Sequence, residues 1–215
     1  MKRSLYISLI LLSSLFSWDL SAQTERPEAR HENMILSAVE RYNEKDADAA
    51  MDILKEIVAE DPENDAAWYY LAIAAMTKGD LAAAEETLKR AIEIDPGNFW
   101  YRYRLARVYA ATQRPELTVD MYEKLLEDFP KKSELYFDMV ELYASQGEFQ
   151  KALDTMKEIE TVFGMTESLA MYRFNLLRMM DRQQEAYASL EEYNEEYSSP
   201  YVLTTLGDYH MSMYN

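Results

Sequence analysis

The chain has 215 residues, of which 48% are hydrophobic, and this supply of apolar side chains is sufficient for a packed core. Its five Gly and six Pro are too few for the turns of an all-β protein, so the composition favours an all-α fold. A formal net charge of −17 argues against nucleic acid as a partner, and the lack of cysteine excludes disulfides and thiolate chemistry.

The first residues have the features of an export signal. A positively charged start precedes a mostly apolar run from Leu5 to Phe16, and small residues before Gln23 form a cleavage site. An uncleaved membrane anchor is the alternative, but a bilayer-spanning helix needs about 20 apolar residues, and this run is shorter and stops at Asp19. We expect a cleaved signal peptide at 1–22, a linker at 23–30, and a mature chain that is soluble in the periplasm or outside the cell, without membrane insertion.

An internal repeat organises the rest of the chain. Pro62, Pro96 and Pro130 are spaced 34 residues apart, and the first two lie in similar contexts, at 60–64 and 94–98. Apolar residues recur at steps of three and four on both sides of a short polar break within each period. The pattern therefore predicts two helices per period.

The second period shows this organisation most clearly. Its first helix is predicted from about Ala66 to Lys78, Gly79 supplies a left-handed cap, and Asp80 caps the helix that follows. Pro96 closes the period, because proline cannot continue a helix. The two buried stripes are formed by Trp68, Leu71, Ala72 and Ala75 on the first helix and by Leu81, Ala84, Leu88, Ala91 and Ile92 on the second.

From about His31 to its end the chain resembles the tetratricopeptide-repeat (TPR) family. The residues that carry the resemblance most strongly are Trp68, Leu71, Ala72, Gly79, Ala84, Leu88, Ala91 and Pro96. The resemblance implies a right-handed superhelical α-solenoid of antiparallel helix pairs, with about five full repeats plus one terminal helix. The expected repeats lie at about 31–64, 65–98, 99–132, 133–166 and 167–199, with a partial one at 200–215.

Small residues are expected where the paired helices cross. Ala72 against Ala84 provides a close contact, and the equivalent pairs are Ala106 with Thr118 and Val140 with Ala152. After residue 164 the pattern departs from the repeat, because Phe174 stands where a small residue is expected. The last predicted helix carries Tyr209, Met211, Met213 and Tyr214, so either the sequence is a fragment of a longer protein or this apolar end is an assembly surface that docks a partner or a second copy.

The sequence holds no motif for catalysis. It has no phosphate-binding glycine loop and no Gly-x-Ser-x-Gly or His-Glu-x-x-His motif, and its two histidines are far apart. The carboxylates around Glu191 and Glu195 are interpreted as a solvated helix face. Asp46 and Asp48 lack the glycine and the terminal glutamate of a calcium loop. We therefore expect a non-enzyme with no cofactor and no metal.

The resemblance also implies a concave groove, lined by the first helices of successive repeats, in which a peptide lies. Aromatic residues at helical spacing are more often core than groove, and a register shift of one residue would turn Tyr69 or Tyr103 inward. The groove candidates in this chain are Ile35, Val39, Tyr42, Tyr69, Ile73, Met76, Trp100, Tyr103, Arg107, Phe137, Glu141, Met171, Asn175 and Arg178.

Export, repeats and the absence of catalytic motifs together predict an interaction module of the cell envelope, which binds a protein or peptide. The alternative is the ligand-sensing or adaptor amino-terminal part of a longer membrane signalling protein or enzyme. The reading frame downstream of Asn215 discriminates between the two.

Overall fold

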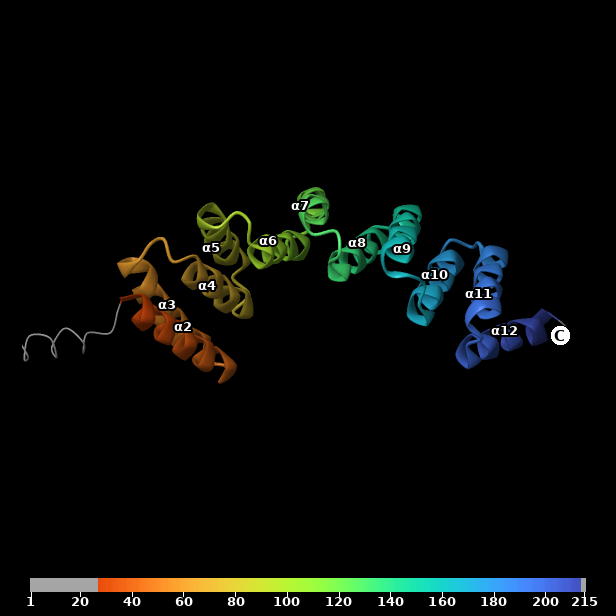
Figure 1. The fold of residues 1–215 in the computed structure, drawn as a ribbon, viewed down its shortest axis with the longest axis horizontal. Helices are drawn as coiled ribbons and strands as arrows, with labels where there is room; N and C mark the ends of the chain where they lie inside the picture. The colour runs from red at the N-terminus through yellow and green to blue at the C-terminus, as the bar shows by residue number, and fades with distance from the viewer. Residues whose placement is uncertain (1–26, 214–215) are drawn as a thin grey trace, which may run out of the picture. The chain divides into compact units, whose positions relative to one another are not determined.

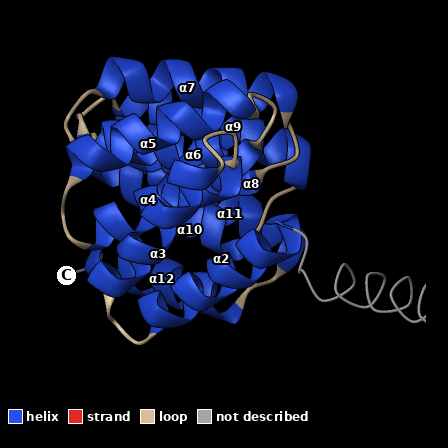
Figure 2. Ribbon diagram, turned by 90° about the vertical axis from the view of Figure 1, so that its left-hand side faces the viewer, coloured by secondary structure: helices blue, strands red, loops and turns tan. Residues whose placement is uncertain are grey.

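The computed structural model describes residues 27–213, which form eleven α-helices and no strand (Figure 1, Figure 2). The all-α fold class is therefore confirmed for this part of the chain. The predicted signal peptide at 1–22 and the terminal Tyr214 lie outside the described residues. None of the described helices is long and apolar enough to cross a bilayer.

The described chain forms two compact units, and the division falls between Tyr101 and Arg102, inside helix α6. The helices that lie wholly in the first unit are α2 (Pro27–Asn43), α3 (Ala47–Glu60), α4 (Asp65–Thr77) and α5 (Leu81–Ile94). Helix α6 (Phe99–Ala111) is followed in the second unit by α7 (Pro115–Asp128), α8 (Ser133–Ser145), α9 (Phe149–Phe163), α10 (Glu167–Met179), α11 (Gln183–Tyr197) and α12 (Pro200–Met213).

Neighbouring helices pair in chain order. In the first unit α2 packs on α3, α3 on α4 and α4 on α5, and α2 also contacts α4. In the second unit α8 packs on α9, α9 on α10, α10 on α11 and α11 on α12. Helix α2 includes residues 27–30 of the segment predicted as a linker.

The predicted small residues lie where the paired helices meet. Ala72 of α4 and Ala84 of α5 are both fully buried. Equivalent buried positions occur in every pair, and they are Ala38 and Ala50, Ala106 and Thr118, Val140 and Ala152, and Phe174 and Ala186. Phe174 is accommodated, because it packs edge-on against Tyr187 at a ring distance of 5.1 Å, while Ala186 supplies the small partner.

A left-handed residue links the two helices of each pair. Gly79 and Gly147 have φ of 78° and 76°, and the residues at the same position in the other three turns are Lys45, Gln113 and Asp181, with φ of 66°, 56° and 58°. The N–H of the next residue donates to the carbonyl five residues earlier in all five turns, as Asp80 does to Ala75 at 3.0 Å. This is the Schellman arrangement, in which glycine is the preferred residue.

The crossing of α4 and α5 leaves no room for a larger side chain at Ala84. We expect Ala84→Leu to lower the free energy of unfolding by about 1–3 kcal/mol, because a well-packed crossing must open to admit the extra atoms. Urea denaturation measures the change. Ala82→Leu, an exposed position on the same helix, is the control and should change stability by less than about 0.5 kcal/mol. Equal effects of the two substitutions would contradict a tight crossing.

The left-handed turns predict a stabilising substitution. Gln113→Gly removes backbone strain of about 1–2 kcal/mol and adds an entropic cost of about 0.5–1 kcal/mol, so we expect a net gain of about 0.5 kcal/mol. Gln146→Gly is the matched control, because Gln146 has a φ of −87° and only the entropic cost applies. Thermal and urea unfolding should rank Gln113→Gly above the wild type and Gln146→Gly below it. The reverse ranking would refute the strain argument.

Candidate functional site

In the first unit, the predicted groove residues lie on the first helices of the pairs and are partly exposed. Ile35, Val39 and Tyr42 on α2 are half-buried, as are Tyr69, Ile73 and Met76 on α4. Trp100, at the start of α6, has 48% of its surface exposed. These side chains therefore provide apolar and aromatic area that a partner can cover.

An aromatic cluster holds this part of the surface in place. The Tyr69 ring lies 5.3 Å from that of Tyr70, edge-on, and 5.0 Å from that of Tyr101. Tyr101 donates its hydroxyl to Asp65 at 2.9 Å, and burial together with this carboxylate raises the pKa of Tyr101 well above its usual value. Tyr101 is thus a neutral hydrogen-bond donor at physiological pH. The ring contacts with Tyr70 and Tyr101 restrict the orientation of the Tyr69 side chain.

In the second unit a cavity of about 350 Å³, with both polar and apolar lining residues, lies among α6, α7 and α8. Two of the predicted residues line it, Arg107 and Glu141, and both are exposed. Their opposite charges suit a ligand that offers both a hydrogen-bond acceptor and a donor, such as a peptide backbone. Tyr103 differs from the other candidates, because it is buried, with 7% of its surface exposed.

The burial of Tyr103 is explained by a hydrogen-bond network that the sequence did not indicate. Asp138 on α8 accepts from the hydroxyl of Tyr103 at 2.8 Å and from that of Tyr122 at 3.0 Å. Burial and the Asp138 carboxylate raise the pKa of Tyr122. An acidic residue on a helix is usually solvent-exposed, so nothing in the sequence singles out Asp138. Three consecutive helices are tied together at this one carboxylate.

The remaining candidates lie on α8 and α10. Phe137 has 44% of its surface exposed, Met171 is half-buried, and Asn175 and Arg178 are exposed. The guanidinium of Arg178 lies 5.4 Å from the ring centroid of Phe174, which orients its charge. In the second unit, polar and charged side chains therefore accompany the apolar ones.

Within residues 27–213, no cluster of three or more His, Cys, Asp or Glu side chains could hold a metal ion.

Comparison with known proteins assigns the repeats. Two family models described as tetratricopeptide repeat match residues 42–93 and 75–117, and residues 103–161, which together span more than half of the chain. The chain is also 30% identical over 84 residues to cellulose synthase operon protein C of Pseudomonas fluorescens (strain SBW25). That match covers 39% of this chain and only 7% of the relative.

Solved structures share the fold at low sequence identity. MamA from Desulfovibrio magneticus RS-1 is similar with a TM-score of 0.64, 15% identity, and coverage of 77% of this chain and 93% of that one. YrrB, described as a TPR protein with an unusual peptide-binding site, has a TM-score of 0.61, 13% identity, and coverage of 90% and 97%. TTC0263, a thermophilic TPR protein of Thermus thermophilus, has a TM-score of 0.53, 20% identity, and coverage of 83% and 97%.

The Asp138 network predicts a pH-dependent stability. Tyr122 has a raised pKa in the folded protein, so its contribution is complete below the unfolded value of about 10 and is lost as the pH rises above it. We expect Tyr122→Phe to cost about 1 kcal/mol at neutral pH, and the difference from wild type to shrink above about pH 10. Urea denaturation across this range measures both effects.

Tyr201→Phe is the control, because Tyr201 is exposed, with 59% of its surface accessible. This variant should match the wild type in stability and in its pH dependence. If Tyr122→Phe lowered the free energy of unfolding by the same amount at neutral and at alkaline pH, the prediction would be wrong, because ionisation of the Tyr122 hydroxyl would then not affect stability.

Proposed function

The chain belongs to the tetratricopeptide-repeat family, and from this membership we propose that it is a non-catalytic protein-interaction scaffold, which binds a peptide or protein partner along the surface of its first helices. The observation that carries the proposal is the partly exposed apolar and aromatic area on α2 and α4, together with Trp100 at the start of α6, which is nearly half exposed. A monomeric protein rarely exposes such side chains together without a use for them. The described peptide-binding site of YrrB supports the same use of this fold.

We place this scaffold in the cell envelope, because the amino-terminal sequence has the pattern of an export signal. In this proposal residues 1–22 are removed, 23–30 begin the mature chain, and the repeats occupy 31–215. The net charge of −17 argues against nucleic acid as the partner. Self-association through α12 is part of the proposal, because α12 exposes Leu203 and Met211.

The second candidate function is a ligand-sensing or adaptor part of a longer membrane signalling protein or enzyme. The similarity to a relative of which this chain covers only 7% favours it, since repeats of this kind also occur inside much longer proteins. A reading frame that continues past the Asn215 codon into a membrane-spanning segment would support this candidate, and a stop codon there would remove it.

Photocrosslinking in intact cells tests the first-helix surface. A benzophenone amino acid is placed in the tagged full-length chain at Ile73 or Val39, and in a control at Glu56, which is exposed on the second helix α3. We expect the two first-helix positions, and not Glu56, to capture the same envelope protein. We also expect Trp100→Ala to weaken binding of that purified partner about thirty-fold, the loss typical of an interface hot spot of about 2 kcal/mol.

Equal capture from Glu56, or no capture from either first-helix position, would remove the proposed surface. A captured protein with no envelope location would instead remove only the cellular assignment.

A further inference from the structure

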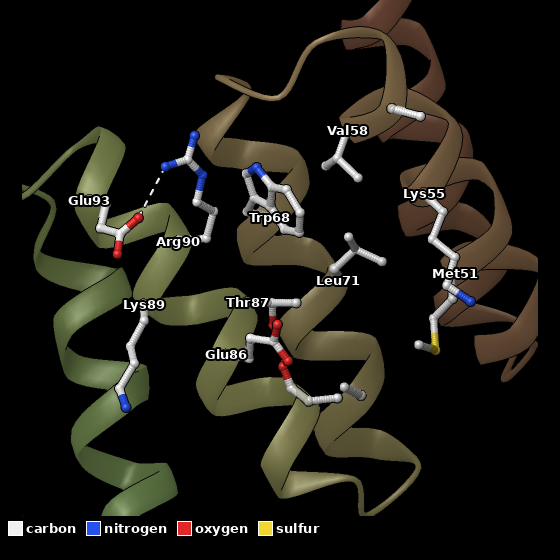
Figure 3. Close-up of a pocket in the computed structure, with 13 residues that line it drawn as sticks. Met51, Lys55, Val58, Trp68, Leu71, Glu86, Thr87, Lys89, Arg90 and Glu93 are labelled. Atoms are coloured by element: carbon white, nitrogen blue, oxygen red, sulfur yellow. Dashed lines mark hydrogen bonds and ion pairs between the residues drawn. The ribbon is translucent and has the colours of Figure 1, made fainter.

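A second concave surface lies in the first unit, between the second helices α3 and α5 (Figure 3). It is a hollow of about 730 Å³, a size in the usual range of about 300–1,000 Å³ for ligand sites. Figure 3 shows Trp68 and Leu71 of α4 at its centre, with Val58 and Met51 of α3 on one side. Most of the central lining is apolar, which is the composition of a site that receives an apolar side chain.

This hollow uses a different face of α4 from the predicted groove. Trp68, Leu71 and Ala75 line it, whereas the groove candidates on the same helix are Tyr69 and Ile73. At about 100° per residue, the two sets point in directions roughly 150° apart around the helix axis. One ligand side chain therefore cannot contact both sets, and the hollow is a separate site.

The chemistry of this hollow differs from that of one hollow in the second unit. The hollow among α7, α8 and α9 uses equivalent positions, but Tyr143 stands at the position of Ala75 and Lys151 at the position of Ala83. The Lys151 ammonium lies 5.6 Å from the centroid of the Tyr143 ring. Of these two hollows, only the one in the first unit has two small residues, Ala75 and Ala83, beside a partly exposed tryptophan, with the buried Leu71 at its floor.

The charge of the rim also differs between the two hollows. Lys55 and Arg90 of the first unit correspond to Glu123 and Glu158 in the second. The Lys55 ammonium has an ion-pair contact with Asp52 at 4.0 Å, and the Lys55 side chain is 61% exposed. Arg90 pairs with the exposed carboxylates of Glu63 and Glu93, and surface pairs of this kind are weak enough to exchange for a ligand carboxylate.

We propose that this hollow binds an acidic peptide segment, in which a large apolar side chain packs on Trp68 and Leu71 and neighbouring carboxylates contact Lys55 and Arg90. Charge complementarity selects this occupant, because the lining carries three cations, Lys55, Lys89 and Arg90, against the two carboxylates of Glu86 and Glu93, whereas the whole chain has a net charge of −17. The basic start of the chain itself, with Lys2 and Arg3, does not meet this requirement. The site is additional to the first-helix surface and does not depend on it.

The test uses the full chain with Trp18→Phe and Trp100→Phe, so that Trp68 is the remaining tryptophan and its emission can be excited selectively over that of the tyrosines. It is titrated with acetyl-Glu-Glu-Leu-Phe-Glu-Glu-amide and with the same peptide carrying lysine in place of glutamate. We expect saturable quenching by the acidic peptide and binding of the lysine peptide at least about tenfold weaker. The net charge of −17 attracts the lysine peptide to the protein as a whole, so only the local rim can produce this preference.

Lys55→Glu, which reproduces the residue of the second unit, should weaken the acidic peptide at least about tenfold. Lys124→Glu makes the same charge change at an exposed position outside the hollow and should leave the affinity within about twofold. Ala83→Lys, which introduces the side chain found at Lys151, should also block the hollow. Photocrosslinking from Ile73 should persist in the Lys55→Glu chain, which separates failure of this site from failure of the first-helix surface.

Equal binding of both peptides, or an unchanged Trp68 signal, would overturn the proposal. A Trp68 shift that depends on protein concentration without any peptide, and that Lys55→Glu removes, would overturn it in favour of a second copy of the chain as occupant. A Trp68 signal that changes only when residues 1–22 are removed would overturn it in favour of the chain's own amino-terminal segment.

Discussion

The close approach of two helices at one small residue in each pair is the constraint on which the rest of this structure depends. At Ala72 and Ala84 the side chains are methyl groups, so the helix axes can come near the short end of the usual separation of about 8–10 Å. The larger residues on either side of this point then interlock. Every pair buries the equivalent positions, and the 34-residue spacing of the prolines follows the same crossing along the chain.

The crossing fixes which surfaces are left for partners. The first helices α4, α8 and α10 each contact their own second helix and the second helix of the preceding pair, and the remaining stripe is the candidate groove face. The second helices leave a hollow over the first helix of the next pair, and the residues at its floor decide its chemistry. In the first unit, Ala75 and Ala83 leave an apolar hollow. In the hollow among α7, α8 and α9, Tyr143 and Lys151 occupy the same positions and place a charged side chain there.

The helix pairs, their order and the buried small residues could be predicted from the sequence, because proline spacing and apolar periodicity report directly on them. The left-handed turns could be predicted only where they contain glycine. Lys45, Gln113 and Asp181 adopt the same conformation because the contact between the helices imposes it against their local preference. Asp138 could not be predicted as a tie between helices, since its role depends on two tyrosines, the nearer of which lies 16 residues away in the chain.

Helix α12 shows what the same constraint requires of any helix that packs on it. The position equivalent to Ala72 is Gly207, and it is exposed, whereas the equivalent residue in each of the five pairs is buried. Leu203, one turn earlier, is also exposed. A glycine at the crossing permits an even closer approach than alanine, so a covering helix can pack here with a small residue of its own at the contact. Because Val202 and Leu206 are already buried on a stripe about 100° away around the axis of α12, this exposed stripe has the geometry of a second-helix contact rather than of the candidate groove.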